Sequence, residues 1–149
     1  MFTVMVFSDD TDLLMYQPYV FEQGIASFAS FHAVAADELV RDLKKEWLRA
    51  LHAFSNDLPT WWDCTFEGEQ LNPVQWKSAA VYRVLGWHVL PLLAATVGGA
   101  GFVEMMQFYR SLYVQEFADV VQSGLEYHLG SGYVVVNRRS IAELQRLQR

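Results

Sequence analysis

Two stretches decide the fold: Asn72–Gly86, which reads NPVQWKSAAVYRVLG, and Phe102–Phe117, which reads FVEMMQFYRSLYVQEF. Both are helix-patterned and nearly apolar all round, and the glycine-rich run Gly98–Gly101 separates them. So short a link predicts an antiparallel helix hairpin. A helix that is apolar on more than one face must be covered, and the chain has few other long elements. We therefore expect other copies of the chain to supply the cover, which favours an assembly protein over an enzyme.

The ends of these helices carry recognisable signals. Asn72 can cap the first helix, Pro73 suits its first turn, and Gln75 has the spacing of a capping box. Pro91 should kink this helix or end it at the preceding residue, because proline lacks a backbone donor. The second helix should end at Gly124, which is placed for a left-handed cap.

Further patterns complete a mainly α fold. Apolar residues recur every four positions within Phe31–Phe54, opposite a charged face, which predicts an amphipathic helix. Phe2–Phe7 and Gly130–Val136 have the composition of short strands. We expect a small helical bundle around a central antiparallel helix hairpin, with short β or extended segments at the N-terminus and near residues 132–136.

Size and composition limit the classes of protein. The 149 residues fit a single domain, residues 1–149, with residues 128–149 as a C-terminal arm. The composition is 52% hydrophobic and 15% aromatic against 19% charged, which is rich in apolar residues. Glycines break the longest uncharged run before the ~20 residues that a bilayer requires, so we expect no membrane segment. The single cysteine, Cys64, excludes an intrachain disulfide, and the start lacks a signal-peptide pattern.

Charge is unevenly distributed along the chain. The net charge is −6. Residues 1–75 hold twelve acidic and four basic side chains, whereas residues 76–149 hold five acidic and seven basic ones. An acidic body with a basic tail indicates either head-to-tail complementarity between copies or an acidic partner surface, and a solvated terminus explains the charge equally well.

No pattern typical of catalysis or metal binding is present in the sequence. No two histidines have metal-ligand spacing, and we expect His88 to be a hydrogen-bonded core residue. Asp9, Asp10 and Asp12 lack the spacing of a calcium loop, which predicts solvated surface. Asp63 beside Cys64 disfavours a reactive thiolate. We therefore predict no catalytic, cofactor-binding or metal-binding residues, and no cofactor.

Bulky aromatic residues lie in the connector between the amphipathic helix and Asn72. Such residues either fold back onto the core or anchor a neighbouring subunit, because tryptophan is enriched at interface hot spots. On the second interpretation, the subunit interface includes Trp61, Trp62 and Phe66.

Five segments together resemble the small head–tail connector (adaptor) proteins of tailed bacteriophages. The resemblance spans roughly residues 20–127 and has no catalytic motif. The segments are Phe21–Ile25 (FEQGI), Ala36–Trp47 (ADELVRDLKKEW), Leu71–Leu85 (LNPVQWKSAAVYRVL), Val89–Leu93 (VLPLL) and Phe108–Phe117 (FYRSLYVQEF).

The resemblance implies a structural virion protein made in the host cytoplasm and placed in the neck. Copies in that family form a ring, typically of twelve, below the portal protein. The ring extends the DNA channel, through which DNA passes without sequence-specific binding, and docks the next neck or tail component. The C-terminus often reaches the portal, so the resemblance assigns portal contacts to Arg138, Arg139, Arg146 and Arg149. After Tyr127 the chain departs from the family pattern.

Two other classes of protein remain open from the residues alone. A small helical protein-binding or immunity-type protein, acting as a monomer or dimer, explains the acidity and the aromatic residues equally well. A helical enzyme with a dispersed site is the third class, although no polar constellation in the sequence favours it.

Deleting residues 137–149 tests the predicted role of the tail. The bundle should keep its helical circular dichroism, whereas docking to portal rings should weaken because the arginines are lost. Co-sedimentation with portal rings measures the docking, and docking equal to that of the full chain would contradict a role for the tail.

Overall fold

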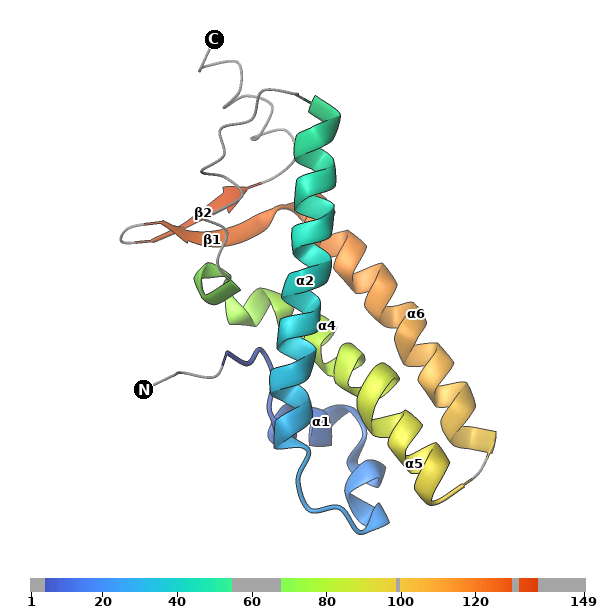
Figure 1. Ribbon diagram of the computed structural model, residues 1–149. Helices are drawn as coiled ribbons and strands as arrows, with labels where there is room; N and C mark the ends of the chain where they lie inside the picture. The colour runs from blue at the N-terminus through green and yellow to red at the C-terminus, as the bar shows by residue number, and fades with distance from the viewer. Residues whose placement is uncertain (1–4, 55–67, 99, 130–131, 137–149) are drawn as a thin grey trace.

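The computed structural model describes residues 5–54, 68–98, 100–129 and 132–136, and its fold is mainly α, as predicted. Helices lie in sequence before a C-terminal β-hairpin (Figure 1). The elements are α1 (Asp10–Tyr16), the 3-10 helix η1 (Pro18–Gln23), α2 (Ala29–Phe54), the 3-10 turn η2 (Gly68–Gln70), α4 (Pro73–Val84), the π-helical turn η3 (Leu85–Val89), α5 (Leu90–Thr96), α6 (Ala100–Ser123), β1 (Leu125–Leu129) and β2 (Gly132–Val136).

The central feature is the predicted hairpin, in which α4, η3 and α5 run in one direction and α6 returns alongside them (Figure 1). Asn72 caps α4, because its side chain accepts a hydrogen bond from the Val74 amide at 3.1 Å. The predicted capping box is wrong, because the Gln75 side chain bonds elsewhere. Its Nε2 donates to the Gly124 carbonyl, and its Oε1 accepts from the Glu126 backbone N–H. Gln75 therefore ties the start of α4 to β1. Gly124 has the predicted left-handed conformation, with φ of 106°.

Pro91 does not end the helix, which continues to Thr96. The chain widens into the π-helical turn η3 immediately before α5, and the Leu90 amide bonds the Leu85 carbonyl five residues earlier. Such a turn shifts the hydrogen-bond register, so the helix accommodates a residue that has no amide hydrogen. The turn also places Gly86, Trp87 and His88 where neighbouring helices approach.

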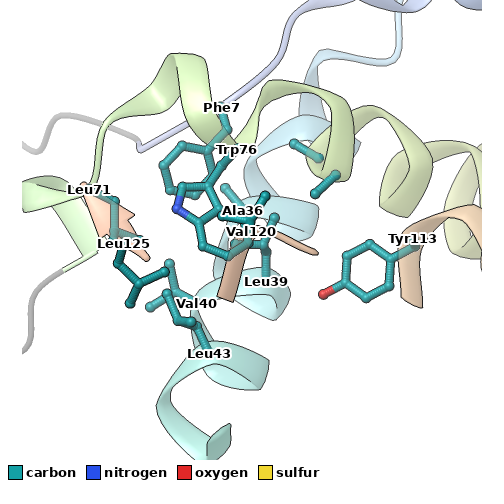
Figure 2. Close-up of a cluster of buried hydrophobic side chains, with 12 residues drawn as sticks. Phe7, Ala36, Leu39, Val40, Leu43, Leu71, Trp76, Tyr113, Val120 and Leu125 are labelled. Atoms are coloured by element: carbon teal, nitrogen blue, oxygen red, sulfur yellow. The ribbon is translucent and has the colours of Figure 1, made fainter. Parts of the chain in front are cut away.

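The apolar surface of α4 is covered within the chain. Figure 2 shows Trp76 of α4 among side chains from the N-terminal segment, α2, α6 and β1. A second cluster joins Leu85 and Leu90 to side chains of α1, η1 and α6. The expectation that other copies must cover Asn72–Gly86 is therefore wrong for this segment, since α1, α2 and α6 surround it. Pro73–Thr96 is long and apolar enough to cross a membrane by length and composition alone, but half of it is buried inside the protein, as in the core helix of a globular domain.

The C-terminal hairpin pairs β1 with β2 in antiparallel register, from Leu125 opposite Val136 to Leu129 opposite Gly132. The predicted strand near residues 132–136 is confirmed, whereas its partner β1 was not expected, because LEYHL lacks the β-branched residues of a typical strand. At the N-terminus, residues 5–7 have no regular structure, and residues 1–4 lie outside the described part of the chain.

Gly86→Ala should destabilise the fold by about 1–3 kcal/mol, because an added Cβ crowds a packed helix. That Cβ would lie 3.1 Å from Cγ and 3.2 Å from the backbone nitrogen of Arg110, and the backbone cannot give way without moving α6. Urea unfolding measures the effect.

Gly101→Ala provides the matched control for Gly86→Ala. No atom lies within 4 Å of its Cβ position, and the residue is exposed near the start of α6. This substitution should raise the free energy of unfolding by up to ~1 kcal/mol through helix propensity. Equal effects of the two substitutions would show that the contact between Gly86 and Arg110 does not constrain the fold.

Candidate functional site

A polar network joins α2 to α4 through one arginine. Arg83 Nη2 lies 2.5 Å from Glu38 Oε2, and its Nη1 lies 3.3 Å from Asp42 Oδ2. Glu38 and Asp42 are one helical turn apart on α2, so their like charges oppose each other until Arg83 lies between them. The arginine side chain is only 14% exposed. Because a charge removed from water is stabilised only by charged or hydrogen-bonding partners, Glu38 and Asp42 are needed to hold it there.

Two more side chains complete the polar network, which comprises Glu38, Asp42, Arg83, His88 and Tyr113. His88, in η3, hydrogen-bonds Glu38 through Nε2 and stacks on Phe31, with ring centroids 5.6 Å apart. This agrees with its expected place as a hydrogen-bonded core residue. Tyr113 of α6 donates its hydroxyl hydrogen to Asp42 at 2.8 Å. The network therefore ties α2, α4, η3 and α6 together.

Burial and neighbouring charges act against each other on the pKa of Glu38 but in the same direction on the pKa of Tyr113. Burial by itself would raise the pKa of Glu38, but the hydrogen bonds and positive charges of Arg83 and His88 outweigh it, so its pKa is lowered. Burial and the Asp42 carboxylate both raise the pKa of Tyr113 far above its ordinary value. Tyr113 therefore remains a neutral hydrogen-bond donor, and Glu38 remains an anion, at neutral pH.

The π-helical turn adds aromatic contacts beside the network. Trp87 lies against two guanidinium groups, with its ring centroid 4.2 Å from Arg83 Cζ and 5.3 Å from Arg110 Cζ. Arg110 also donates its Nε hydrogen to the Gly86 carbonyl at 3.0 Å. π-Helical turns are frequent at functional sites, but here the turn serves packing: each cation is engaged by neighbouring helices. These contacts hold the helices in place relative to one another, and they leave no acid–base pair of the network available to a substrate.

A second buried set has the residue types of a hydrolase triad. The Ser8 hydroxyl lies 2.7 Å from His32 Nδ1, and His32 Nε2 lies 3.1 Å from Asp10 Oδ1. The Asp10 carboxylate also accepts hydrogen bonds from the Ser27 hydroxyl and the Phe28 amide. Because Ser8 is 5% exposed, its hydroxyl is not presented to a substrate. These bonds instead fasten the segment before α1 to the start of α2.

Asp10 and Asp12 are part-buried and structural, which corrects the prediction of solvated surface for them, whereas Asp9 is exposed as predicted. Asp9 and Asp12 form a reciprocal capping box at the start of α1. Asp10 has a lowered pKa, because its hydrogen bonds and the nearby His32 outweigh the effect of burial. Among the described residues, no group of three or more potential ligand side chains could hold a metal ion.

Exposed apolar side chains are found mainly on α6 and near α1. On α6, Phe108 is 58% and Val114 is 63% exposed, whereas Tyr109 and Tyr113 are buried. We call the exposed side of this helix the α6 outer face: it carries two charges, Glu104 and Asp119, and comprises Val103, Glu104, Gln107, Phe108, Ser111, Val114, Gln115, Ala118, Asp119 and Gln122. Near α1, the exposed apolar residues are Leu14, Met15, Tyr16 and Tyr19.

The site residues predicted from sequence lie outside the described part of the chain. They are the interface residues Trp61, Trp62 and Phe66, and the portal contacts Arg138, Arg139, Arg146 and Arg149. The α6 outer face and the polar network were not predicted as sites. The network did leave a signal in the sequence: the like-charged pair Glu38 and Asp42, and a lone arginine, Arg83, on an otherwise apolar helix.

Comparisons with protein-family models, with curated proteins and with solved structures found no match to this chain.

Acidification should reveal the role of Glu38. Because the carboxyl pKa is lowered by folding, its contribution to stability is complete above the ordinary value of 4.5 and is lost as the pH falls toward the lowered value. Glu38→Gln should therefore flatten the loss of unfolding free energy over this range, as measured by urea unfolding at successive pH values. Asp10 adds its own loss at more acid pH in both proteins.

Glu69→Gln, which alters an exposed glutamate outside the polar network, should leave the pH dependence unchanged. Superimposable pH profiles for the wild type and Glu38→Gln would contradict the stabilising role of the ion pairs.

Proposed function

We propose that this protein is a head–tail connector subunit of a tailed bacteriophage. Copies form a ring below the portal, the ring extends the DNA channel, and its far side docks the tail. The subunit is a structural component of the virion neck and not an enzyme. The sequence resemblance over residues 20–127 is the origin of this proposal, and the mainly α fold is compatible with it.

The observation that carries the proposal is the α6 outer face. A helix of 24 residues packs against α4 and α5 on one side and exposes Val103, Phe108 and Val114 on the other. Phe108 lies about 120–140° around the helix from Val103 and Val114, so the three side chains are spread across the outer face among uncharged polar residues. An exposed face with apolar side chains and few charges is typical of a protein interaction site. A ring subunit needs such a surface, because each copy must bury part of itself against the next.

The polar network supports the proposal through rigidity. A ring closes only when each subunit holds its two contact surfaces at a fixed angle. Arg83 connects α4 to two carboxylates of α2, and Tyr113 connects α6 to one of the same carboxylates. These contacts hold α2 and α6, the two helices with exposed outer faces, at a fixed relative orientation.

The overall charge suits a channel through which DNA moves. The net charge is −6, and an acidic lining repels the phosphate backbone. DNA then passes without the counter-ion release that makes nucleic-acid binding strong.

Phe108→Ser tests whether the α6 outer face drives ring formation on a portal. Ring assembly on portal rings, counted by electron microscopy, should fall at least tenfold, since a central apolar contact is lost. The free energy of unfolding should change by only about 0.5 kcal/mol, because the side chain is exposed.

Met15→Ser is the matched control, since it removes an apolar side chain of α1 that is 81% exposed; it should leave assembly unchanged. A wild-type chain that stays a monomer or dimer with every portal tested, and binds a different protein one to one, would replace the connector by the immunity-type alternative.

A further inference from the structure

Exposed residues on α6 form a stripe with a defined order of chemistry. Glu104, Phe108, Gln115 and Asp119 are separated by four, seven and four residues, so they share one side of the helix. All four are exposed. Phe108 is the apolar member. The two acidic members are Glu104, four residues before it, and Asp119, eleven residues beyond it.

A second stripe on α2 has the complementary order. Val34, Arg41 and Lys45 are separated by seven and four residues and are all exposed, with Val34 at 46%. The exposed Asp37 lies three residues after Val34 and four before Arg41, so its charge offsets that of Arg41 and leaves Lys45 as the base available to Asp119. Lys45 is the basic member eleven residues beyond the apolar one. The neighbouring Lys44 is also exposed, but it lies about 100° around the helix and outside the stripe.

The spacing of the two stripes matches. Eleven residues of α-helix span ~16 Å, so the distance along the axis from Val34 to Lys45 equals that from Phe108 to Asp119. If the two helices lie parallel, Val34 meets Phe108 while Lys45 meets Asp119, and Arg41 is one turn away. In Figure 1 both α2 and α6 run upward, with α6 inclined relative to α2. The contact therefore requires a neighbour rotated so that its α2 lies along this α6.

We propose that the occupant of the α6 outer face is α2 of a second copy of this chain, with Val34 on Phe108 and Lys45 paired with Asp119. This interface rests on the proposed ring. Because α2 and α6 present different surfaces, the contact is heterologous and repeats head to tail, which produces a closed ring or an open filament. The charges favour a second copy over a foreign partner, since the acid on α6 and the bases on α2 are complementary within one sequence.

Two charge reversals test the pairing. In Asp119→Lys the α6 stripe repels Arg41 and Lys45 of the neighbour, and in Lys45→Glu the α2 stripe repels Asp119. Each variant alone should self-associate at least about tenfold more weakly than the wild type, measured by sedimentation velocity over a concentration series. An equimolar mixture should recover assembly, because every interface between unlike variants regains an opposite-charge pair.

Two matched controls test the register. Glu104→Lys reverses a charge on the α6 stripe, at a position that the proposed register places opposite the uncharged Ser30. Lys44→Glu reverses a charge on α2 that lies outside the α2 stripe. Both should associate like the wild type. Thermal unfolding of every variant shows whether the bundle remains folded.

The outcomes separate this interface from the proposed function. A mixture that stays monomeric, controls as defective as the reversals, or a wild type that never self-associates would each overturn the interface. If the wild type nevertheless docks on portal rings, the connector function stands with another subunit contact. If the mixture assembles but no portal ring binds the wild type, the interface stands and the connector function fails.

Discussion

The arrangement of the helices depends on the ion pairs of one cation. Arg83 projects from α4, a helix packed largely against apolar side chains, and a guanidinium left there without partners would destabilise the fold by several kcal/mol. Glu38 and Asp42 of α2 supply the counter-charges, while Trp87 and Tyr113 lie against the guanidinium. Apolar packing alone tolerates small shifts between helices. Ion pairs of defined length do not, so they set where α2 crosses α4.

The same contacts determine what the molecule presents to its surroundings. Tyr113 links α6 to Asp42, and Arg110 links α6 to the Gly86 carbonyl in the π-helical turn. With its inner side committed in this way, α6 turns Phe108 and Val114 outward, and α2 turns Val34, Arg41 and Lys45 outward. An assembly built from these two faces would take its geometry from the polar network, because neither helix can rotate without breaking a part-buried hydrogen bond.

Sequence reasoning succeeded where neighbours along the chain decide the structure. Asn72 caps α4 and Gly124 ends α6 because both effects need only a few consecutive residues. It failed where a distant group competes for the same atom. Gln75 has the spacing of a capping box, but its side-chain amide bonds the backbone of Gly124 and Glu126 instead. The hydrogen bonds of Asp10 to Ser27 and His32 are of the same distant kind. Pro91 is a local exception: the π-helical turn directly before it changes the hydrogen-bond register, so the helix does not end there.

The sequence by itself determined the mainly α class, the helix hairpin, the start of α4 and the end of α6, since apolar periodicity, capping residues and glycine act over one or two turns. Only the tertiary structure decided which charges meet: Arg83 finds Asp42 and Glu38 at separations of 41 and 45 residues, and periodicity carries no information about such pairings. It also decided that α4 is largely covered by its own chain while one side of α6 stays exposed. Both segments are almost equally apolar in the sequence, and the packing of α1 and α2 against α4 makes the difference in burial.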